Sequence, residues 1–167
     1  MTASEALEKL LPSFFRYYNV KTEDVTEPFS AEAEFYTHDE SYFLFKEAKM
    51  NESESREFIF FSALTHLDVD TLKKQDETAW NTGMSRVVIT PIHHSTDVTL
   101  IILAETIDKD AAKLIRKLAH HKSYCFNFKG FSRYRLIALE TSTGKITHNH
   151  LGSELKKLVR NISQCKG

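Results

Sequence analysis

Glycine, proline and cysteine are all scarce in this chain of 167 residues, which has five, three and two of them. No stretch enriched in glycine, proline or serine offers a linker, so we expect one globular domain over residues 1–167. Cys125 lies in an aromatic stretch and Cys165 in the tail, without the spacing of a zinc site or a disulfide framework. This cysteine usage favours a reducing compartment.

Long apolar runs are missing as well. The longest, Val98 to Ala104 with Thr99 inside it, is far shorter than the ~20 residues that cross a bilayer. Polar Thr2 and Glu5 stand where a signal peptide would need a basic start and an apolar core. The sequence therefore predicts a cytoplasmic protein that does not associate with membranes.

Motifs for common cofactors are also absent. There is no Walker loop, no G-x-G-x-x-G and no G-x-S-x-G, so nucleotide cofactors and a hydrolase elbow lose their usual support and we expect no cofactor. Histidines recur at His93-His94, His120-His121 and His148-Asn149-His150. No Asp, Glu or Cys stands near the last group to complete a ligand set, so we expect no transition metal at His148 and His150.

What the chain does have is a strong charge asymmetry. Residues 1–108 carry 20 Asp+Glu against 9 Lys+Arg, and residues 109–167 carry 3 against 13, so a net charge of -1 divides into about -11 and +10. Either the two parts pair inside the fold, or the basic part faces an anionic partner. We favour internal pairing, because the acidic part would repel the same polyanion.

Hydrophobic periodicity predicts an α+β fold, a mixed sheet with helices packed on it in the order αβββαβαβ plus a C-terminal helix. The first helix covers Ala3–Tyr18. Three strands, Phe29–Tyr36, Tyr42–Met50 and Glu57–Leu64, form an antiparallel meander, and the first of them alternates apolar and polar residues as a strand with one buried face does.

The second half of the chain predicts a parallel strand–helix–strand unit. Asp68 or Asp70 caps a helix that ends near Gly83, and Arg86–Ile92 fits either a strand or a continued helix. The remaining expected elements are a buried strand at Val98–Thr106, a helix capped by Asp108, a parallel strand at Arg133–Glu140, a hairpin into Lys145–His148 and a helix at Ser153–Ile162.

The apolar faces of these elements predict which side chains are mostly buried. They are Phe29, Ala31, Ala33, Phe35, Ile59, Phe61, Trp80, Ile101, Leu103, Leu114, Leu118 and Leu136.

The predicted α-βββ-α-β core resembles the restriction-endonuclease-like fold. The resemblance implies a nuclease in which an acidic residue and a Glu-x-Lys hold Mg²⁺ and activate water, and the matching positions are Asp39, Glu47 and Lys49. The pattern departs from the family, because Asp39 falls in a turn and the Glu-x-Lys on the second strand instead of the third. The competing interpretation is a solvated or cross-strand-paired hairpin end.

A second resemblance is carried by Tyr42–Leu44, His121–Phe126, Gly130-Phe131, Arg133–Leu139 and Gly144-Lys145. In these stretches the chain is similar to a group of small uncharacterised bacterial proteins of unknown function. The resemblance implies a standalone domain without an assigned activity.

Basic and aromatic residues interleave in the same region, a composition that single-stranded nucleic-acid platforms use. The candidate anion-binding residues are Lys122, Lys129, Arg133 and Arg135. A pair of core strands with basic residues on the exposed positions would give the same pattern. Our leading hypothesis is a non-catalytic protein that binds a protein partner, or a nucleic acid through its basic part; the metal-dependent nuclease is the alternative.

Overall fold

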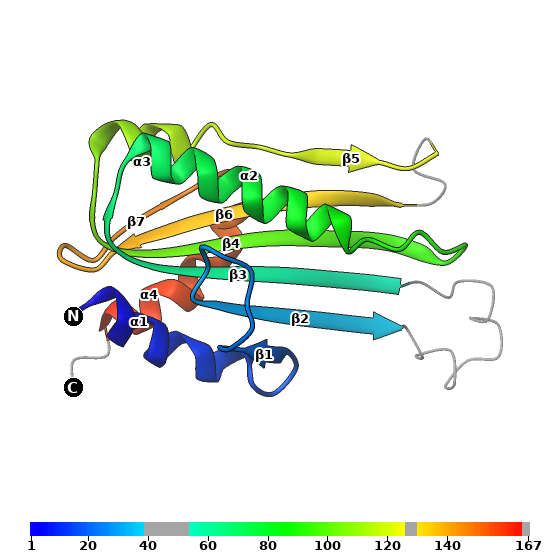
Figure 1. The fold of residues 1–167 in the computed structure, drawn as a ribbon, viewed down its shortest axis with the longest axis horizontal. Helices are drawn as coiled ribbons and strands as arrows, with labels where there is room; N and C mark the ends of the chain where they lie inside the picture. The colour runs from blue at the N-terminus through cyan, green and yellow to red at the C-terminus, as the bar shows by residue number, and fades with distance from the viewer. Residues whose placement is uncertain (39–53, 126–129, 165–167) are drawn as a thin grey trace.

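The computed structural model describes residues 1–38, 54–125 and 130–164, and within them seven strands form one mixed sheet between two layers of helices (Figure 1). The strand order is β1-β2-β3-β4-β6-β5, with β7 also paired to β6. In chain order the elements are α1 (Ala3–Leu10), the 3₁₀ helix η1 (Leu11–Phe14), β1 (Asn19–Lys21), β2 (Ala31–His38), β3 (Glu54–Leu67), α2 (Val69–Ser85), β4 (His93–Ile107), α3 (Lys109–Ile115), β5 (His121–Ser123), β6 (Phe131–Glu140), β7 (Lys145–His148), the 3₁₀ helix η4 (Leu151–Leu155) and α4 (Lys156–Gln164).

The sheet has an antiparallel part and a parallel part. Strands β1, β2 and β3 are antiparallel neighbours, whereas β3, β4 and β6 run parallel, with α2 and α3 in the connections between them. The predicted α+β class, the mixed sheet and the parallel unit of β4 and β6 are confirmed.

The composition of the antiparallel part differs from the prediction. Strands β2 and β3 pair directly, with Ala33 opposite Ile59, so no strand lies between them in this register. Placing Tyr42–Met50 between them was therefore wrong; that segment lies outside the described residues. The third antiparallel strand is β1, whose three residues are too few to show a period of two.

The first helix is shorter than predicted. A capping box starts α1, in which the Thr2 hydroxyl accepts a hydrogen bond from the Glu5 backbone N–H. The α-helix ends at Leu10 and η1 follows, because Pro12 has no N–H to donate and its ring opposes the α-helical turn before it. Further along, Asp68 caps α2 as expected, Arg86–Ile92 is neither helix nor strand, and β4 already begins at His93.

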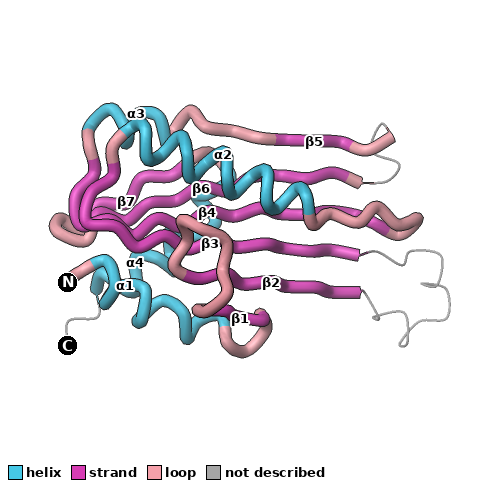
Figure 2. The backbone as a smooth tube through the Cα atoms, in the orientation of Figure 1, coloured by secondary structure: helices cyan, strands magenta, loops and turns pink. Residues whose placement is uncertain are grey.

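Alternation along the strands builds two cores, one on each face of the sheet. On the α1/α4 face, residues such as Ile59, Ile101 and Ile137 pack under α1, η1 and α4. On the α2/α3 face, residues such as Phe60 and Leu100 pack under α2 and α3. Figure 2 shows the two layers of helices on either side of the strands. Most side chains of the predicted core are buried, and only Phe35, Trp80, Leu114 and Leu118 are half-buried, so that prediction is confirmed.

Asn149 closes a gap along the outer edge of β6, where β5 pairs with residues 131–133 and β7 with residues 137–140. Its backbone N–H donates to the Leu136 carbonyl at 3.0 Å, and its side-chain oxygen accepts from the N–H groups of Leu136 and Gly152. Its side-chain nitrogen donates to the carbonyls of Leu118 and Tyr134. Gly152 is required beside it, because a Cβ there would lie 2.1 Å from the Leu136 oxygen.

We expect Asn149→Ala to lower the free energy of unfolding by about 2–4 kcal/mol, because buried backbone groups of β6 and of the turn at Gly152 lose their partners. Urea denaturation followed by circular dichroism measures the change. Asn161→Ala, at an exposed position of α4, is the matched control and should leave stability nearly unchanged. Equal effects of the two substitutions would contradict this role of Asn149.

Candidate functional site

A cluster of charged side chains lies on the α1/α4 face near the amino-terminal ends of the parallel strands. The strand register places Glu57 of β3, Asp97 of β4 and Arg133 of β6 in one row across the sheet. Thr99 and Arg135 stand side by side in the next row, after which the apolar rows of the core begin. Side chains two apart on a strand share a face, which is why these residues meet.

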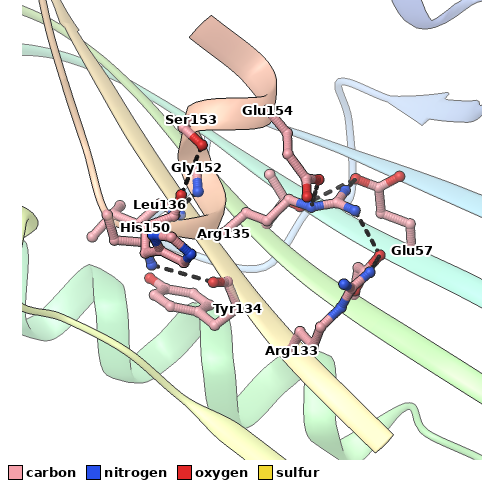
Figure 3. A network of polar contacts seen from close by, with 12 residues as sticks. Glu57, Arg133, Tyr134, Arg135, Leu136, His150, Gly152, Ser153 and Glu154 are labelled. Carbon is pink, nitrogen blue, oxygen red and sulfur yellow. Dashed lines mark hydrogen bonds and ion pairs between the residues drawn. The ribbon is translucent and has the colours of Figure 1, made fainter.

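Arg135 is the centre of this charge network, and Figure 3 shows it between the carboxylates of Glu57 from β3 and Glu154 from η4. Its Nη1 lies 3.0 Å from Glu57 Oε1, its Nη2 lies 2.7 Å from Asp97 Oδ2, and its Nε lies 3.0 Å from Glu154 Oε2. Arg133 holds the same Asp97, with its Nε 2.9 Å from Oδ1 and its Nη2 3.2 Å from Oδ2. Each of the three guanidinium nitrogens of Arg135 therefore lies within hydrogen-bonding distance of a carboxylate oxygen.

Tyr18 and Thr99 complete the hydrogen bonding of Glu57. The Tyr18 hydroxyl donates to Oε2 at 2.7 Å and the Thr99 hydroxyl to Oε1 at 3.1 Å. Burial raises the pKa of Tyr18, and the negative charge of Glu57 raises it further, so this hydroxyl stays protonated. Hydrogen bonds to Asp97 likewise raise the pKa of Arg133.

The charges of this network largely neutralise one another. Three carboxylates face two guanidinium groups, which leaves a net charge of about -1, and a guanidinium occupies the space where a shared cation would have to lie. Across residues 1–38, 54–125 and 130–164, no group of three His, Cys, Asp or Glu side chains is arranged to hold a metal ion. Arg133 and Arg135 come from the basic part of the chain and Glu57 and Asp97 from the acidic part, so part of the charge asymmetry pairs internally.

The residues proposed for anion binding are only partly brought together. Arg133 and Arg135 are neighbours in the network, but both are already bound to carboxylates. Lys122 is exposed on β5, with its Nζ 5.4 Å from the centroid of the Tyr124 ring, and Lys129 lies outside the described residues. Their role in anion binding stays a prediction.

The nuclease residues Asp39, Glu47 and Lys49 also lie outside the described residues, so the proposed Mg²⁺ site stays a prediction. Of the aromatic residues that suggested a nucleic-acid platform, Phe131 lies beside Arg133, whose guanidinium carbon is 5.3 Å from the centroid of the ring, and Tyr124 lies beside Lys122. Tyr134 is fully buried on the α2/α3 face, and Phe131 is half-buried between the rings of His94 and His121.

A second polar cluster, which sequence reasoning missed, lies under α2. His120 Nε2 is 2.9 Å from Asp76 Oδ2, and the imidazole stacks on Trp80 and meets the edge of Tyr134. Burial raises the pKa of Tyr134 well above its ordinary value, and the charge of Asp76 adds to the effect. The available signal was an acidic residue inside the apolar stripe of α2, between Leu72 and Ala79.

A third arrangement is the pair of Glu32 and Arg86, where the sequence predicted an exposed acidic side chain. Glu32 is buried on the α2/α3 face because the Arg86 guanidinium, just after α2, lies 2.9 Å from it and packs over the Phe60 ring. Burial alone would raise the pKa of Glu32, but hydrogen bonds from Arg86 and from Thr26 outweigh it and hold the pKa below its ordinary range.

Exposed basic side chains also lie on β7 and on the two helices that contact it, α3 on one face of the sheet and α4 on the other. We call this the lysine surface. Among the described residues, only Lys113 of this set has an ion pair, with Asp110. The lysine surface consists of Lys109, Lys113, Arg116, Lys117, Lys145, Lys156, Lys157 and Arg160, all exposed.

A shallow pocket of about 190 Å³ opens within the lysine surface, at the carboxyl ends of β4 and β6. Its lining residues are Ile107, Lys109, Ala112, Glu140, Lys145 and Thr147.

The fold and the two polar ends of its parallel strands define an α+β sandwich with an internally neutralised charge network at one end and a basic surface at the other. A family model described as "Domain of unknown function (DUF8052)" matches residues 2–161, and the chain belongs to that family. The predicted resemblance to proteins of unknown function is thereby confirmed. No curated protein and no solved structure matches the chain. None of the helices in the described ranges is long and apolar enough to span a bilayer.

Asp97→Asn should lower the free energy of unfolding by about 2–3 kcal/mol, because both Arg133 and Arg135 lose a shared counter-charge in a site where the Asp97 side chain is only 12% exposed. Chemical denaturation at neutral pH measures it. Asp110→Asn removes an exposed ion pair with Lys113 and should have little effect. If Asp97→Asn were as mild as this control, the network would carry no stability.

Acid should release the Glu32 pair. A carboxyl whose pKa is lower in the folded state stabilises the protein above its unfolded pKa, and this contribution disappears as the pH falls through the folded pKa. We expect Glu32→Gln to be less stable than the parent at neutral pH and to lose less stability between about pH 6 and about pH 3. Denaturation midpoints across this range test it, and a parallel loss in both proteins would contradict it. Glu34→Gln, exposed on the same strand, should match the parent at neutral pH.

Proposed function

We propose that the protein is a non-catalytic, cytoplasmic binding protein that holds the phosphate backbone of a nucleic acid duplex on its lysine surface. The observation that carries the proposal is the division of the basic residues. Arg133 and Arg135 are paired with carboxylates of the internal network, whereas the basic residues of α3, β7 and α4 are exposed to solvent. An exposed free thiol at Cys125 suits a reducing compartment.

The acidic groups near the lysine surface neutralise only part of it. Asp110 pairs with Lys113, which belongs to the surface, whereas Glu154 is bound to Arg135 of the internal network. Glu140 accepts hydrogen bonds from the Ile107 backbone N–H and the Thr143 hydroxyl. Exposed acidic residues such as Glu23 and Glu34 belong to the β1–β2 edge, at the other side of the sheet. A polyanion can therefore approach the α3, β7 and α4 side without meeting that acidic edge.

The residue types favour contact with phosphates over contact with bases. Lysine is a flexible point charge that suits phosphate groups, and such contacts carry no sequence information. In the described part of the chain, the large apolar side chains that are exposed all precede residue 109: Met1, Phe15, Tyr17, Tyr36, Val88 and Ile89. Without an exposed aromatic platform on the lysine surface, stacking on unpaired bases has no support there, which favours a duplex.

The test is a titration of labelled duplex DNA and RNA at several salt concentrations with the parent protein and a variant carrying Lys156→Gln, Lys157→Gln and Arg160→Gln. Each lost phosphate contact should reduce the slope of log affinity against log salt by about 0.9, and three should weaken binding at least about tenfold at moderate salt. The matched control carries Lys21→Gln, Lys73→Gln and Lys74→Gln, which remove the same charge from exposed positions of β1 and α2.

Equal losses in the two variants, or no binding by the parent at low salt, would overturn the proposal. Magnesium-dependent cleavage that Glu47→Ala abolishes would replace it with the nuclease hypothesis.

A further inference from the structure

We infer that the pocket within the lysine surface is a binding site for a phosphorylated sugar, whose phosphate lies on Lys109 and Lys145 and whose hydroxyl groups donate to Glu140. The inference rests on the proposed function where it takes the sugar phosphate to be the end of a nucleic acid strand. The same chemistry is offered by a free nucleotide, and the experiment below distinguishes the two sources.

The position of the pocket suits a ligand site. It lies where β4 and β6 end and where α3 and β7 begin, and the carboxyl ends of parallel strands are the side of open α/β sheets on which ligands bind. Its volume of about 190 Å³ is smaller than the roughly 300–1,000 Å³ of pockets for drug-sized ligands. The pocket can therefore hold a sugar phosphate, but it is too small to enclose a base as well.

Two lysines supply the charge for a phosphate. Lys109 and Lys145 line the pocket from α3 and β7, and neither has an ion-pair partner among residues 1–38, 54–125 and 130–164. A phosphomonoester carries nearly two negative charges at neutral pH, so each ammonium group can pair with one of them, and with Glu140 the occupied pocket has a net charge of about -1. A neutral sugar would leave both lysines without an anionic ligand.

Glu140 makes the site selective for a ligand that also carries hydrogen-bond donors. Its Oε1 accepts from the Ile107 N–H at 2.9 Å and its Oε2 accepts from the Thr143 hydroxyl, which fixes the carboxylate in the wall of the pocket. An ionised carboxylate offers about four lone-pair sites, so two remain for the ligand. Sugar hydroxyls can donate to both of them, whereas inorganic phosphate brings fewer donors and places its negative charge next to the carboxylate.

The same charges argue against a divalent cation. The pocket holds one carboxylate, already hydrogen-bonded, and two ammonium groups that repel a metal ion. Thr147, which is buried, adds a hydroxyl to the wall and suits a polar ligand.

The experiment measures binding of ribose 5-phosphate, ribose and inorganic phosphate to the full chain by calorimetry or by chemical-shift titration. Ribose 5-phosphate should bind most tightly, and Lys109→Gln with Lys145→Gln should weaken it at least about tenfold. Lys156→Gln with Lys157→Gln, which removes equal charge outside the pocket, should change it less than about twofold. Glu140→Gln should narrow the preference for ribose 5-phosphate over inorganic phosphate. Equal affinity for inorganic phosphate and ribose 5-phosphate, or equal losses in the two lysine variants, would overturn the site.

Oligonucleotide duplexes with a 5′-phosphate or a 5′-hydroxyl separate the two sources. Tighter binding of the phosphorylated duplex, reversed by ribose 5-phosphate and by the Lys109 and Lys145 substitutions, assigns the site to a strand end. Binding of ribose 5-phosphate without any duplex binding assigns it to a free sugar phosphate, and then the proposed function fails while the pocket stands. A third outcome is duplex binding that depends on Lys156 and Lys157 while neither ribose 5-phosphate nor the terminal phosphate changes it. That result would leave the proposed function intact and overturn the proposed pocket site.

Discussion

The guanidinium of Arg135 is the constraint on which the rest of the structure depends. It binds carboxylates from β3, from β4 and from the turn before α4, so one side chain ties two parallel strands to the closing helix. A guanidinium group stays charged in a protein, and the Arg135 side chain is only 13% exposed. Its burial is therefore tolerable only when all three carboxylates are in place, which couples the sheet register to the position of η4 and α4.

This network also decides which basic residues remain for a partner. The planar fork of arginine matches carboxylates with two or more parallel hydrogen bonds, and β6 carries arginine at both positions that meet Asp97. Lysine, a compact and strongly hydrated charge, is the main basic residue of the exposed surface on α3, β7 and α4. The asymmetry of charge in the sequence thus has two outcomes, internal pairing for the arginines of β6 and exposure for the lysines.

The local elements of this fold could be predicted from the sequence, but the contacts between distant segments could not. Period-two alternation located β2, continuous apolar runs located β3 and β4, and side-chain chemistry located the Asp68 cap. Burial of Glu32 depends on Arg86, 54 residues away, and the pair of Arg135 and Glu57 spans 78 residues. In the sequence, Glu57 and Asp97 are polar residues near strand ends, and only the register that aligns them with Arg133 makes them a site.

The two ends of the parallel strands consequently have different chemistry. At the amino-terminal ends, opposite charges satisfy one another and the Glu57 and Asp97 carboxylates are nearly closed to solvent, so a ligand there would have to break ion pairs that the fold needs. At the carboxyl ends, β6 turns into β7 and two lysines line a pocket with a single, fixed carboxylate. Binding at that end would cost the fold no existing ion pair among the described residues, and neutralising the two lysines would relieve repulsion between them. We therefore expect substitutions at Asp97 to change the stability of the protein, and substitutions at Lys109 and Lys145 to change the proposed binding without affecting stability.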